Sequence, residues 1–404
     1  MRTLDVDVTL IGGGAAGLWL LNRLRGLGYR TLLFEHKALG SEQTIASQGM
    51  IHGGIKYTLS GALSGASEAI AGMPDHWRRC LRGEGDVDLR GASILSDHFY
   101  LWSASSAAAR LTTFFASKAT RGRVDRVTGG ELPALLQHPA FRGAVYKLVD
   151  MVLDIPEILA LLANQARGAI YQIDWRHSHL DPDNGEGTPV LVINTDAGGI
   201  RINNRALIFC AGQGNEQLLK DVGAIAPAMQ RRPLQQVMVR HQHPHRFYGH
   251  CLGAESTPRL TISSHPCDDG SQVWYLGGNL AEKGADMTAG ALIDKARSEL
   301  GALLPWVDLK DAQWATHPVD RAEPRQRHFA RPDQAYADWA QGCKNVIAAW
   351  PTKLTLAPNL ATVVLELLKA RDILPDRKRD AFTDTLPLAP PPIAPTPWQR
   401  AFNP

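Results

Sequence analysis

The sequence has 404 residues, of which 44% are hydrophobic and 21% are charged, and its formal net charge at pH 7 is +3. A chain of this length and ordinary composition exceeds one small domain, so we expect two folded domains. The small net charge and the lack of a long basic run argue against nucleic-acid binding.

The cysteines and the apolar stretches bear on the location of the protein. Five scattered cysteines without a C-x-x-C pair or a secretory leader favour a reducing cytoplasm and provide no zinc-site spacing. Residues 4–24 are apolar enough to suggest a membrane span, but charged residues and a glycine cluster interrupt them. We therefore expect a cytoplasmic protein without a metal centre; peripheral contact with the inner membrane through an apolar patch stays open.

The first 35 residues predict a complete β-α-β unit. A strand over residues 4–11 runs directly into the turn Gly-Gly-Gly-Ala-Ala-Gly at residues 12–17. Residues 18–27 have the apolar spacing of a helix, and residues 31–34 form a second β-rich run that ends in Glu35. This order of elements is typical of a dinucleotide-binding unit.

The glycines and the acid of this unit have specific roles in such a site. Gly12 permits the tight turn, Gly14 lets the backbone approach a pyrophosphate, and Gly17 lets the helix pack closely on the strand. The helix N-terminus then directs unpaired N–H groups at the phosphates. Glu35 is placed to bind ribose hydroxyls, and its charge favours FAD or NAD over a cofactor with a 2′-phosphate.

The next stretch, residues 45–57, is rich in small residues and paired glycines. It suggests backbone lying against a flat ligand, although a glycine-rich loop is an equally simple interpretation. Residues 60–81 predict a long helix that Pro74 should kink or divide. We expect further strands at residues 97–102 and 145–153 and helices at residues 104–119 and 155–166.

Three β-rich runs follow, at residues 170–175, 190–195 and 200–209, with a hairpin loop at 181–188 between the first two. The third run ends in Ala211-Gly212 and starts a helix, which predicts a second contact with the cofactor.

From residue 233 onward, β-rich runs separated by turns predict an antiparallel substrate domain. These runs are residues 235–241, 259–264 and 273–279, and a helix is expected at 287–304. Four histidines, His241, His243, His245 and His250, suggest a metal site by composition only, and a surface edge is the favoured interpretation.

The chain returns to βα character near its end, with a strand at 345–350, a turn at 351–355 and a helix at 357–374. The predicted fold class is α/β with a discontinuous first domain. Its parts are residues 1–80, 150–225 and 340–375, whereas residues 81–149 and 226–339 form the substrate domain. Residues 376–404 form a proline-rich tail in which we expect no regular structure, packed along the surface or unstructured; docking to a partner is a lesser alternative.

These motifs, in this order, resemble the FAD-dependent oxidoreductases of the D-amino-acid oxidase superfamily over about residues 3–372. Within it, residues 50–57 together with Lys353-Leu354-Thr355 look most like the flavin-linked glycerol-3-phosphate dehydrogenases, followed by the L-2-hydroxyglutarate dehydrogenases. The resemblance implies a Rossmann-like FAD-binding domain of glutathione-reductase type and a mainly antiparallel substrate domain.

The resemblance also implies which residues bind FAD. The ADP half would contact Gly12, Gly14, Ala15, Ala16, Gly17, Glu35 and His36, and the pyrophosphate and ring side Ser47, Gln48 and Gly49. Ala211 and Gly212 would cover the other edge of the flavin, and Lys353, Leu354 and Thr355 would close on the isoalloxazine end.

On the substrate side, the resemblance implies a cationic pocket for a small anion. Lys56 stands where the glycerol-3-phosphate enzymes carry the arginine of an Arg-Tyr pair, and Tyr57 follows it. Arg325, with Arg321 in reserve, and Lys353 would add positive charge. Trp350-Pro351-Thr352 replaces the glycine pair of those enzymes, and their extra C-terminal helical domain is lacking, so a hydroxy acid or an amino acid fits as well as a phosphate ester.

His52 is the candidate base, because an imidazole titrates near working pH; packing under the flavin or binding it are the alternatives. A covalent flavin at His52 or Cys343 is a further alternative. Three functions stay open: an FAD-dependent dehydrogenase or oxidase of a small anion, a flavin enzyme using NAD(P)H, and a non-catalytic flavoprotein scaffold. The electron acceptor could be oxygen, a quinone or an electron-transfer protein.

Overall fold

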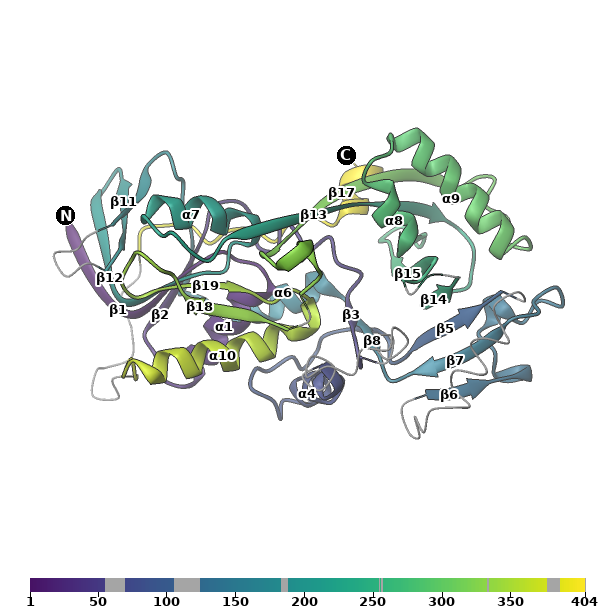
Figure 1. Cartoon of the computed structure of the whole chain (residues 1–404), viewed down its shortest axis with the longest axis horizontal. Helices are drawn as coiled ribbons and strands as arrows, with labels where there is room; N and C mark the ends of the chain where they lie inside the picture. Colours follow the sequence, from purple (N-terminus) through teal and green to yellow (C-terminus); the bar gives the residue numbers. More distant parts are fainter. Residues whose placement is uncertain are drawn as a thin grey trace.

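The computed structural model describes residues 1–54, 70–104, 124–182, 188–253, 255, 257–332, 334–375 and 386–403. Two β-sheets form two bodies that lie side by side along the long axis of the molecule (Figure 1). The predicted α/β fold with a second, mainly antiparallel sheet is confirmed. The exact domain boundaries stay a prediction.

A parallel sheet forms the centre of the first body, with strand order β9-β2-β1-β12-β19. Its strands are β1 (Arg2–Ile11), β2 (Thr31–Glu35), β9 (Ile170–Gln172), β12 (Gly198–Phe209) and β19 (Val346–Trp350). Antiparallel strands β10 (Ser178–Asp181), β11 (Val190–Thr195) and β18 (Tyr336–Trp339) extend it. The last six residues of β1 and all of β2 are buried, as expected for parallel strands covered on both faces.

Helices cover this sheet because each carries an apolar stripe. Helix α1 (Ala15–Gly26) packs against α6 (Ile155–Gln165) and α10 (Ala357–Ala370), and α7 (Asn215–Asp221) follows β12 (Figure 1). In α6, Asp154 caps the N-terminus by accepting a hydrogen bond from the Glu157 amide, and Pro156 lies in the first turn as predicted.

The second body is built on an eight-stranded sheet of order β17-β13-β16-β15-β14-β5-β7-β6, in which β5 and β14 are parallel and all other neighbours antiparallel. The strands are β5 (Phe99–Ser103), β6 (Val124–Val127), β7 (Ala144–Leu148), β13 (Met229–His241), β14 (Gly249–Leu252), β15 (Leu260–Pro266), β16 (Gln272–Gly277) and β17 (Gln313–Pro324). Helices α8 (Asn279–Gly284) and α9 (Ala289–Leu303) pack on it, α9 through the buried stripe Leu292, Ala296, Leu300 and Leu303.

Between the bodies lies a small sheet of β3 (Met50–Ile51), β8 (Met151–Leu153) and β4 (Ile94–Ser96), near helix α4 (Met73–Leu81). Short 3-10 turns complete the described structure at Gly129–Glu131, Ala134–Leu136, Gly212–Gly214, Arg327–Phe329 and Leu354–Leu356. None of the helices in the described ranges has the length and apolar character needed to cross a bilayer.

Several sequence predictions about elements are wrong or incomplete, and two others fall largely or partly outside the described residues. The single strand predicted at 145–153 is two strands, β7 and β8, in different sheets, with Asp150 at the break. The strands β3, β4, β6, β10, β14, β17 and β18 were not predicted. Because β10 was missed, the loop predicted at 181–188 joins β10 to β11 and not the two runs between which it was expected. The proline-rich tail is partly regular, because it ends in helix α11 (Pro397–Phe402). Most of the helix predicted at 104–119 and residues 60–69 of the one at 60–81 lie outside the described residues.

Candidate active site

A cavity of about 950 Å³ lies between the parallel sheet and the eight-stranded sheet of the second body, which we call the substrate sheet. Its floor is the turn between β1 and α1, and its sides are the loop after β2, the end of β12 and the segment after β19. Strands β13 and β17 of the second sheet close it through Leu234, Gln236, Val319, Arg321 and Ala322. The cavity thus joins the nucleotide-binding unit to the second body of the protein.

Two positions in and beside the turn at the floor of the cavity require glycine. Gly12 has a φ of +115°, and a Cβ there would lie 2.6 Å from the backbone of Cys210 and Ala211. A Cβ on Gly17 would lie 2.0 Å from the carbonyl oxygen of Gly12. Strand β12 and helix α1 therefore both press directly on this turn. Gly17 supports the turn from behind and does not itself line the cavity.

The N-terminus of α1 points into the cavity beside Gly14, Ala15 and Ala16. The N-cap residue is Gly14, which has no side chain to accept hydrogen bonds from the first amides of the helix. The Ala15 amide donates to Thr44 Oγ1 at 3.1 Å. The amides of a helix N-terminus favour negatively charged groups such as phosphates. Thr44, which sequence reasoning missed, adds a hydroxyl at the same place.

Glu35 at the end of β2 is buried, and its carboxylate accepts hydrogen bonds from three backbone amides. These are the amides of Gly13 at 2.7 Å and of His36 and Lys37 at 2.9 Å. Burial alone would raise the pKa of Glu35, but the hydrogen bonds from the His36 side chain and the backbone amides outweigh it, and the pKa lies below its usual value. Glu35 is therefore ionised at neutral pH.

The end of β12 meets the cavity through Ala211 and Gly212, the residues for which the sequence predicts a second contact with the cofactor. The Ala211 amide donates to Asn215 Oδ1 at 2.7 Å, and Gly212 has a φ of +56°. The buried indole of Trp350 donates to the Gly212 carbonyl oxygen at 3.0 Å. Trp350 is the first residue of the segment Trp350-Pro351-Thr352, which stands in place of the glycine pair of the related enzymes. It thus holds this edge in position and also lines the cavity.

The segment after β2 ends in Ser47, Gln48 and Gly49. Ser47 and Gln48 line the cavity, and Gln48 also contacts the second sheet, donating to Ser263 Oγ at 3.2 Å and to the Tyr275 carbonyl oxygen at 2.7 Å. Gly49 does not line the cavity; its φ of +69° and the Leu153 carbonyl oxygen 2.2 Å from any Cβ require glycine there. This segment therefore connects the two sheets at the cavity.

His52 lies just beyond this segment and next to the C-terminal turn. Its backbone amide donates to Thr355 Oγ1 at 3.0 Å, and its Nδ1 lies 3.4 Å from Oδ2 of buried Asp150. The same carboxylate accepts the Gly53 amide at 2.8 Å. Asp150, which lies at the break between β7 and β8, thus orients His52, although His52 is not among the residues that line the cavity.

The turn before α10 contributes Lys353 and Leu354 to the cavity but not Thr355. Lys353 is 8% exposed, and its ammonium group lies 3.4 Å from the Pro332 carbonyl oxygen. Thr355 is fully buried and donates to the Met50 carbonyl oxygen at 3.4 Å while it accepts from His52. It holds the glycine-rich segment against the C-terminal turn.

The structure favours Arg321, the reserve candidate, over Arg325 as the cation delivered by the substrate sheet. Arg321 lines the cavity, its side chain is 17% exposed, and it pairs with Glu282 at 3.2 Å. Burial and the nearby charge of Arg232 lower the pKa of Arg321. Arg325 lies one residue beyond β17, is exposed, and stacks on Phe329 outside the cavity.

Three further sequence candidates are Lys56, Tyr57 and Cys343. Lys56 and Tyr57 lie outside the described residues. Cys343 is half-buried and does not line the cavity. Arg331, which sequence reasoning missed, does line it.

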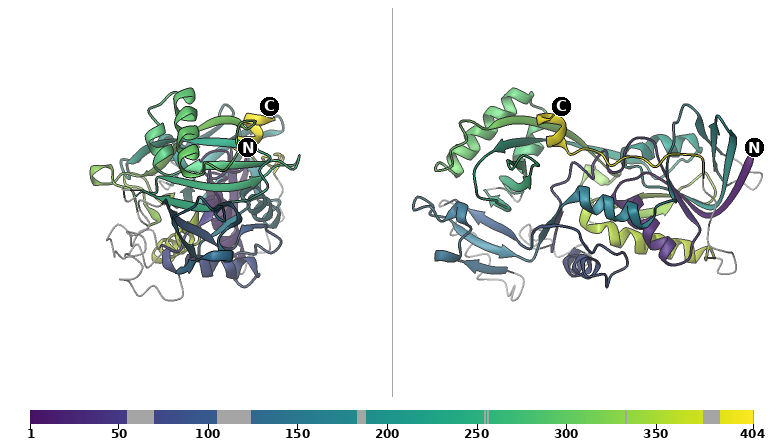
Figure 2. Two further views of the ribbon diagram at one scale, coloured as in Figure 1. Left: turned by 90° about the vertical axis from the view of Figure 1, so that its right-hand side faces the viewer. Right: turned by 180° about the vertical axis from the view of Figure 1, so that it is seen from behind.

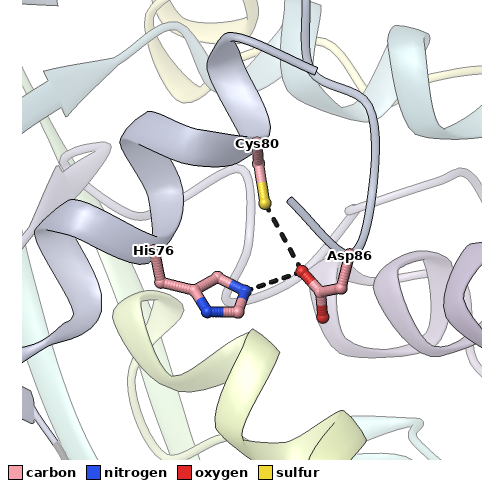
Figure 3. Close-up of side chains that lie close together, drawn as sticks. All are labelled: His76, Cys80 and Asp86. Atoms are coloured by element: carbon pink, nitrogen blue, oxygen red, sulfur yellow. Dashed lines mark hydrogen bonds and ion pairs between the residues drawn. The ribbon is translucent and has the colours of Figure 1, made fainter. Parts of the chain in front are cut away.

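The four histidines that suggested a metal site do not gather as one. His241 and His250 are buried and lie on different strands, whereas His243 and His245 continue along the turn after β13. Among the described residues, the group with suitable ligand atoms is instead His76, Cys80 and Asp86 (Figure 3). Its distances are those of hydrogen bonds: His76 Nε2 lies 2.6 Å and Cys80 Sγ 3.4 Å from Asp86 Oδ1.

Asp86 also accepts a hydrogen bond from the Trp19 indole at 3.2 Å and faces the Arg23 guanidinium at 3.9 Å. Its negative charge is therefore already balanced by this arginine, and a cation here would meet that positive charge. The group connects α4 to α1, and we interpret it as a structural network.

Comparison with known proteins agrees with this geometry. A family model described as "FAD dependent oxidoreductase" (DAO) matches residues 7–336. The chain belongs to this family. A probable FAD-dependent oxidoreductase of Pseudomonas aeruginosa is 45% identical over 403 residues, covering 99% of each chain. The crystal structure of the FAD-dependent oxidoreductase from Pseudomonas aeruginosa has a TM-score of 0.83 at 40% identity, covering 100% of this chain and 99% of that one.

More distant solved structures share the fold of this FAD-dependent oxidoreductase. Glycine oxidase from Geobacillus kaustophilus has a TM-score of 0.65 at 17% identity and covers 94% of this chain and 96% of its own. L-α-glycerophosphate oxidase from Mycoplasma pneumoniae, solved with FAD bound, has a TM-score of 0.61 at 14% identity and covers 91% of this chain and 95% of its own. The predicted family and cofactor are confirmed.

The residues present fit FAD. The glycine turn forms a cradle that a side chain at Gly12 would obstruct, the α1 amides face it, and the ionised Glu35 is ready for ribose hydroxyls. We therefore expect the phosphates at the turn, the adenosine ribose at Glu35, and the flavin end toward Gln48 and Lys353. These individual contacts stay predictions.

We expect Glu35→Gln to weaken FAD binding by about tenfold, because the glutamine side chain has one acceptor oxygen whereas the carboxylate has two. This single oxygen would have to serve the three backbone amides as well as the ribose hydroxyls. FAD titration followed by flavin fluorescence would measure this loss. Glu42→Gln is a suitable control, since Glu42 also lines the cavity but is half-exposed and pairs with Lys37. Equal affinities of the two variants would contradict a role for Glu35.

Proposed function

We propose that this oxidoreductase oxidises a small anionic substrate, such as a hydroxy acid, an amino acid or a compound like glycerol 3-phosphate, by hydride transfer to flavin N5. The observation that carries the proposal is the pair of cations in the wall of the cavity, buried Lys353 and largely buried Arg321. Burying cationic side chains is costly unless anions accompany them. Arg321 has Glu282 beside it, and an anionic substrate would add a further partner.

The names of the distant structural relatives agree with this substrate class. Glycine and L-α-glycerophosphate, the compounds in two of those names, are both small molecules that carry a carboxylate or a phosphate. Iminodiacetate, in the name of an oxidase from Chelativorans sp. BNC1, is another small carboxylate. Arginine suits both kinds of anion, because its planar fork can donate two parallel hydrogen bonds.

Bound FAD would supply the acceptor for the hydride, and the chain must supply a group that takes the proton from the adjoining O–H or N–H. His52 is our candidate, since its Nδ1 lies 3.4 Å from Asp150 Oδ2 and a proton held there would leave the other ring nitrogen to act. In this proposal, the electrons then pass from the reduced flavin to an acceptor, which is oxygen, a quinone or an electron-transfer protein.

Anaerobic titration of the FAD-loaded protein with a panel of small anions tests the proposal. The panel contains glycerol 3-phosphate, L- and D-2-hydroxy acids, and L- and D-amino acids, and the visible flavin spectrum reports reduction. Bleaching by one member would establish the substrate class. Bleaching by NAD(P)H alone would favour a reductase or hydroxylase, and a flavin that nothing reduces would favour a non-catalytic flavoprotein.

We expect His52→Asn to slow flavin reduction by the active substrate by roughly 10²–10⁴-fold while FAD stays bound, because a general base contributes about that much. Stopped-flow reduction and the flavin-to-protein absorbance ratio would measure the two effects. Asp150→Asn should slow reduction less, since the imidazole remains. Unchanged reduction kinetics in His52→Asn would remove this residue from the mechanism.

A further inference from the structure

The C-terminal segment, residues 386–403, connects the two bodies of the protein and passes the loop that forms one side of the FAD cavity. Figure 2 shows it as the yellow trace that runs along the first body and ends in α11 beside the second sheet. We propose that this segment is a strap that holds the cofactor loop, residues 36–48, in place and slows the release of FAD. In the rest of the text we call residues 386–403 the C-terminal strap.

The strap first pairs with the edge of the parallel sheet. The Gln172 amide of β9 donates to the Ala389 carbonyl oxygen at 2.8 Å, and the Leu386 amide donates to the Tyr171 hydroxyl at 3.3 Å. Strand β9 is the edge of the sheet on this side, so the strap satisfies backbone groups that would otherwise face solvent.

The decisive contact is between the strap and Leu39 in the cofactor loop. The Leu39 amide donates to the Pro392 carbonyl oxygen at 2.8 Å, and the Ala394 amide donates to the Leu39 carbonyl oxygen at 3.0 Å. The strap thus pairs with both backbone groups of Leu39, in the manner of a short parallel β-bridge between Leu39 and Ile393.

Leu39 in turn supports the turn that should bind the phosphates. Its Cδ2 would lie 2.6 Å from a Cβ on Gly13, so the leucine side chain packs directly against this glycine. The Gly40 amide donates to the Gly13 carbonyl oxygen at 2.9 Å. Leu39 is 2% exposed, and residues 40–44, which follow it, line the cavity. A shift of Leu39 would therefore move both the loop and the phosphate turn.

The far end of the strap is anchored on the substrate sheet by α11. Trp398 stacks on His265 at a centroid distance of 4.5 Å and contacts the ring of Tyr275 at 5.7 Å. A capping box between Thr396 and Gln399 begins the helix. Arg240 of β13 donates to Asn403 Oδ1 at 3.2 Å, which secures the end of the chain.

Tyr275 extends this anchor to the cofactor loop. Its buried hydroxyl donates to the Ala46 carbonyl oxygen, 3.1 Å away, and lies 2.6 Å from Gln236 Oε1. Ala46 and Gln236 both line the cavity. The strap therefore acts on the cofactor loop at two points, directly at Leu39 and through Trp398 and Tyr275 at Ala46.

A second cavity of about 460 Å³ lies between α11 and this loop, and it shares Ser41, Glu42, Gln43, Leu234 and Val319 with the first. Arg400 of α11 forms part of its wall. Because the two cavities share these residues, loosening of the strap would open the FAD site on this side. The strap residues are positioning residues and do not themselves line the FAD cavity.

The test compares two proline substitutions in the full-length, FAD-loaded protein. Ala394→Pro removes the amide that bonds to Leu39, whereas Ala389→Pro changes an exposed strap residue whose amide donates to no described residue. FAD release is followed by the rise in flavin fluorescence after a large dilution of the protein into FAD-free buffer. We expect Ala394→Pro to release FAD about tenfold faster and Ala389→Pro to stay within twofold of the unaltered protein.

A second pair separates this effect from general loss of stability. Trp398→Ala removes the anchor of α11, and Trp306→Ala removes another stacked tryptophan of the second body, one that packs on His138 at 5.0 Å away from the strap. FAD release should accelerate in Trp398→Ala and not in Trp306→Ala, even where both unfold at similarly lowered temperatures. Release at the unaltered rate in Ala394→Pro, or equal acceleration in the members of either pair, would overturn the proposal.

Discussion

Gly17→Ala is expected to weaken FAD binding strongly. The added methyl group would lie 2.0 Å from the Gly12 carbonyl oxygen, and a backbone atom in a tight turn cannot swing away as a side chain would. Alanine is the better helix former by about 1 kcal/mol, but forced overpacking costs about 1–3 kcal/mol or more and acts on the phosphate turn itself. We expect a loss of affinity on the order of a hundredfold.

Gly26→Ala is the matched control for this prediction. Gly26 is the last residue of the same helix, and an added Cβ would meet nothing within 4 Å. The control should bind FAD normally and unfold at the same or a higher temperature. Titration of FAD into each apoprotein, with far-ultraviolet circular dichroism to confirm folding, measures both effects. Normal FAD binding by Gly17→Ala would contradict the close contact between α1 and the turn.

The nucleotide-binding unit could be predicted from the sequence because its determinants are local. The strand, the glycine turn, the helix and Glu35 follow one another within 35 residues, and Gly12 and Gly17 are required by backbone contacts inside or next to this unit. Local spacing likewise predicted α6, with Pro156 in its first turn, and all of α10, although the predicted helix extended beyond Ala370. In these segments the local preference and the tertiary structure agree.

The break between β7 and β8 could not be predicted, because residues 144–153 read as one continuous β-rich run. The run changes sheets at Asp150, and this change places the carboxylate beside His52, which is distant in the sequence. Strand β17 was missed for a different reason. It is an edge strand with Pro318 and several charged residues, so it lacks the apolar alternation of a half-buried strand.

The tail shows that proline content alone is a poor guide to structure. Seven prolines led us to expect no regular element, yet the short segment Thr396-Pro397-Trp398-Gln399 carries the signal of a helix start. Threonine at the N-cap, proline in the first turn and glutamine three residues after the cap are each favoured there. The same prolines suit the extended part of the strap, which needs few amide donors of its own.

Arg321 and Arg325 could not be separated by sequence, because they lie four residues apart in one motif. Only the position at which β17 leaves the sheet decides between them: Arg321 is still paired with Arg232 of β13, whereas Arg325 has passed the end of the strand. The residue inside the strand faces the cavity, and the one beyond it faces solvent.

Arg321→Gln is therefore expected to reduce kcat/KM for the anionic substrate by roughly ten- to a hundredfold, which corresponds to the loss of one charge-assisted hydrogen bond of about 1.5–3 kcal/mol. The effect should fall mainly on KM, and FAD affinity should change little, because the arginine comes from the substrate sheet. Arg325→Gln removes the same charge four residues away and should keep normal kinetics. Steady-state rates for both variants measure the difference, and similar losses in both would mean that Arg321 acts only through the overall charge of this region.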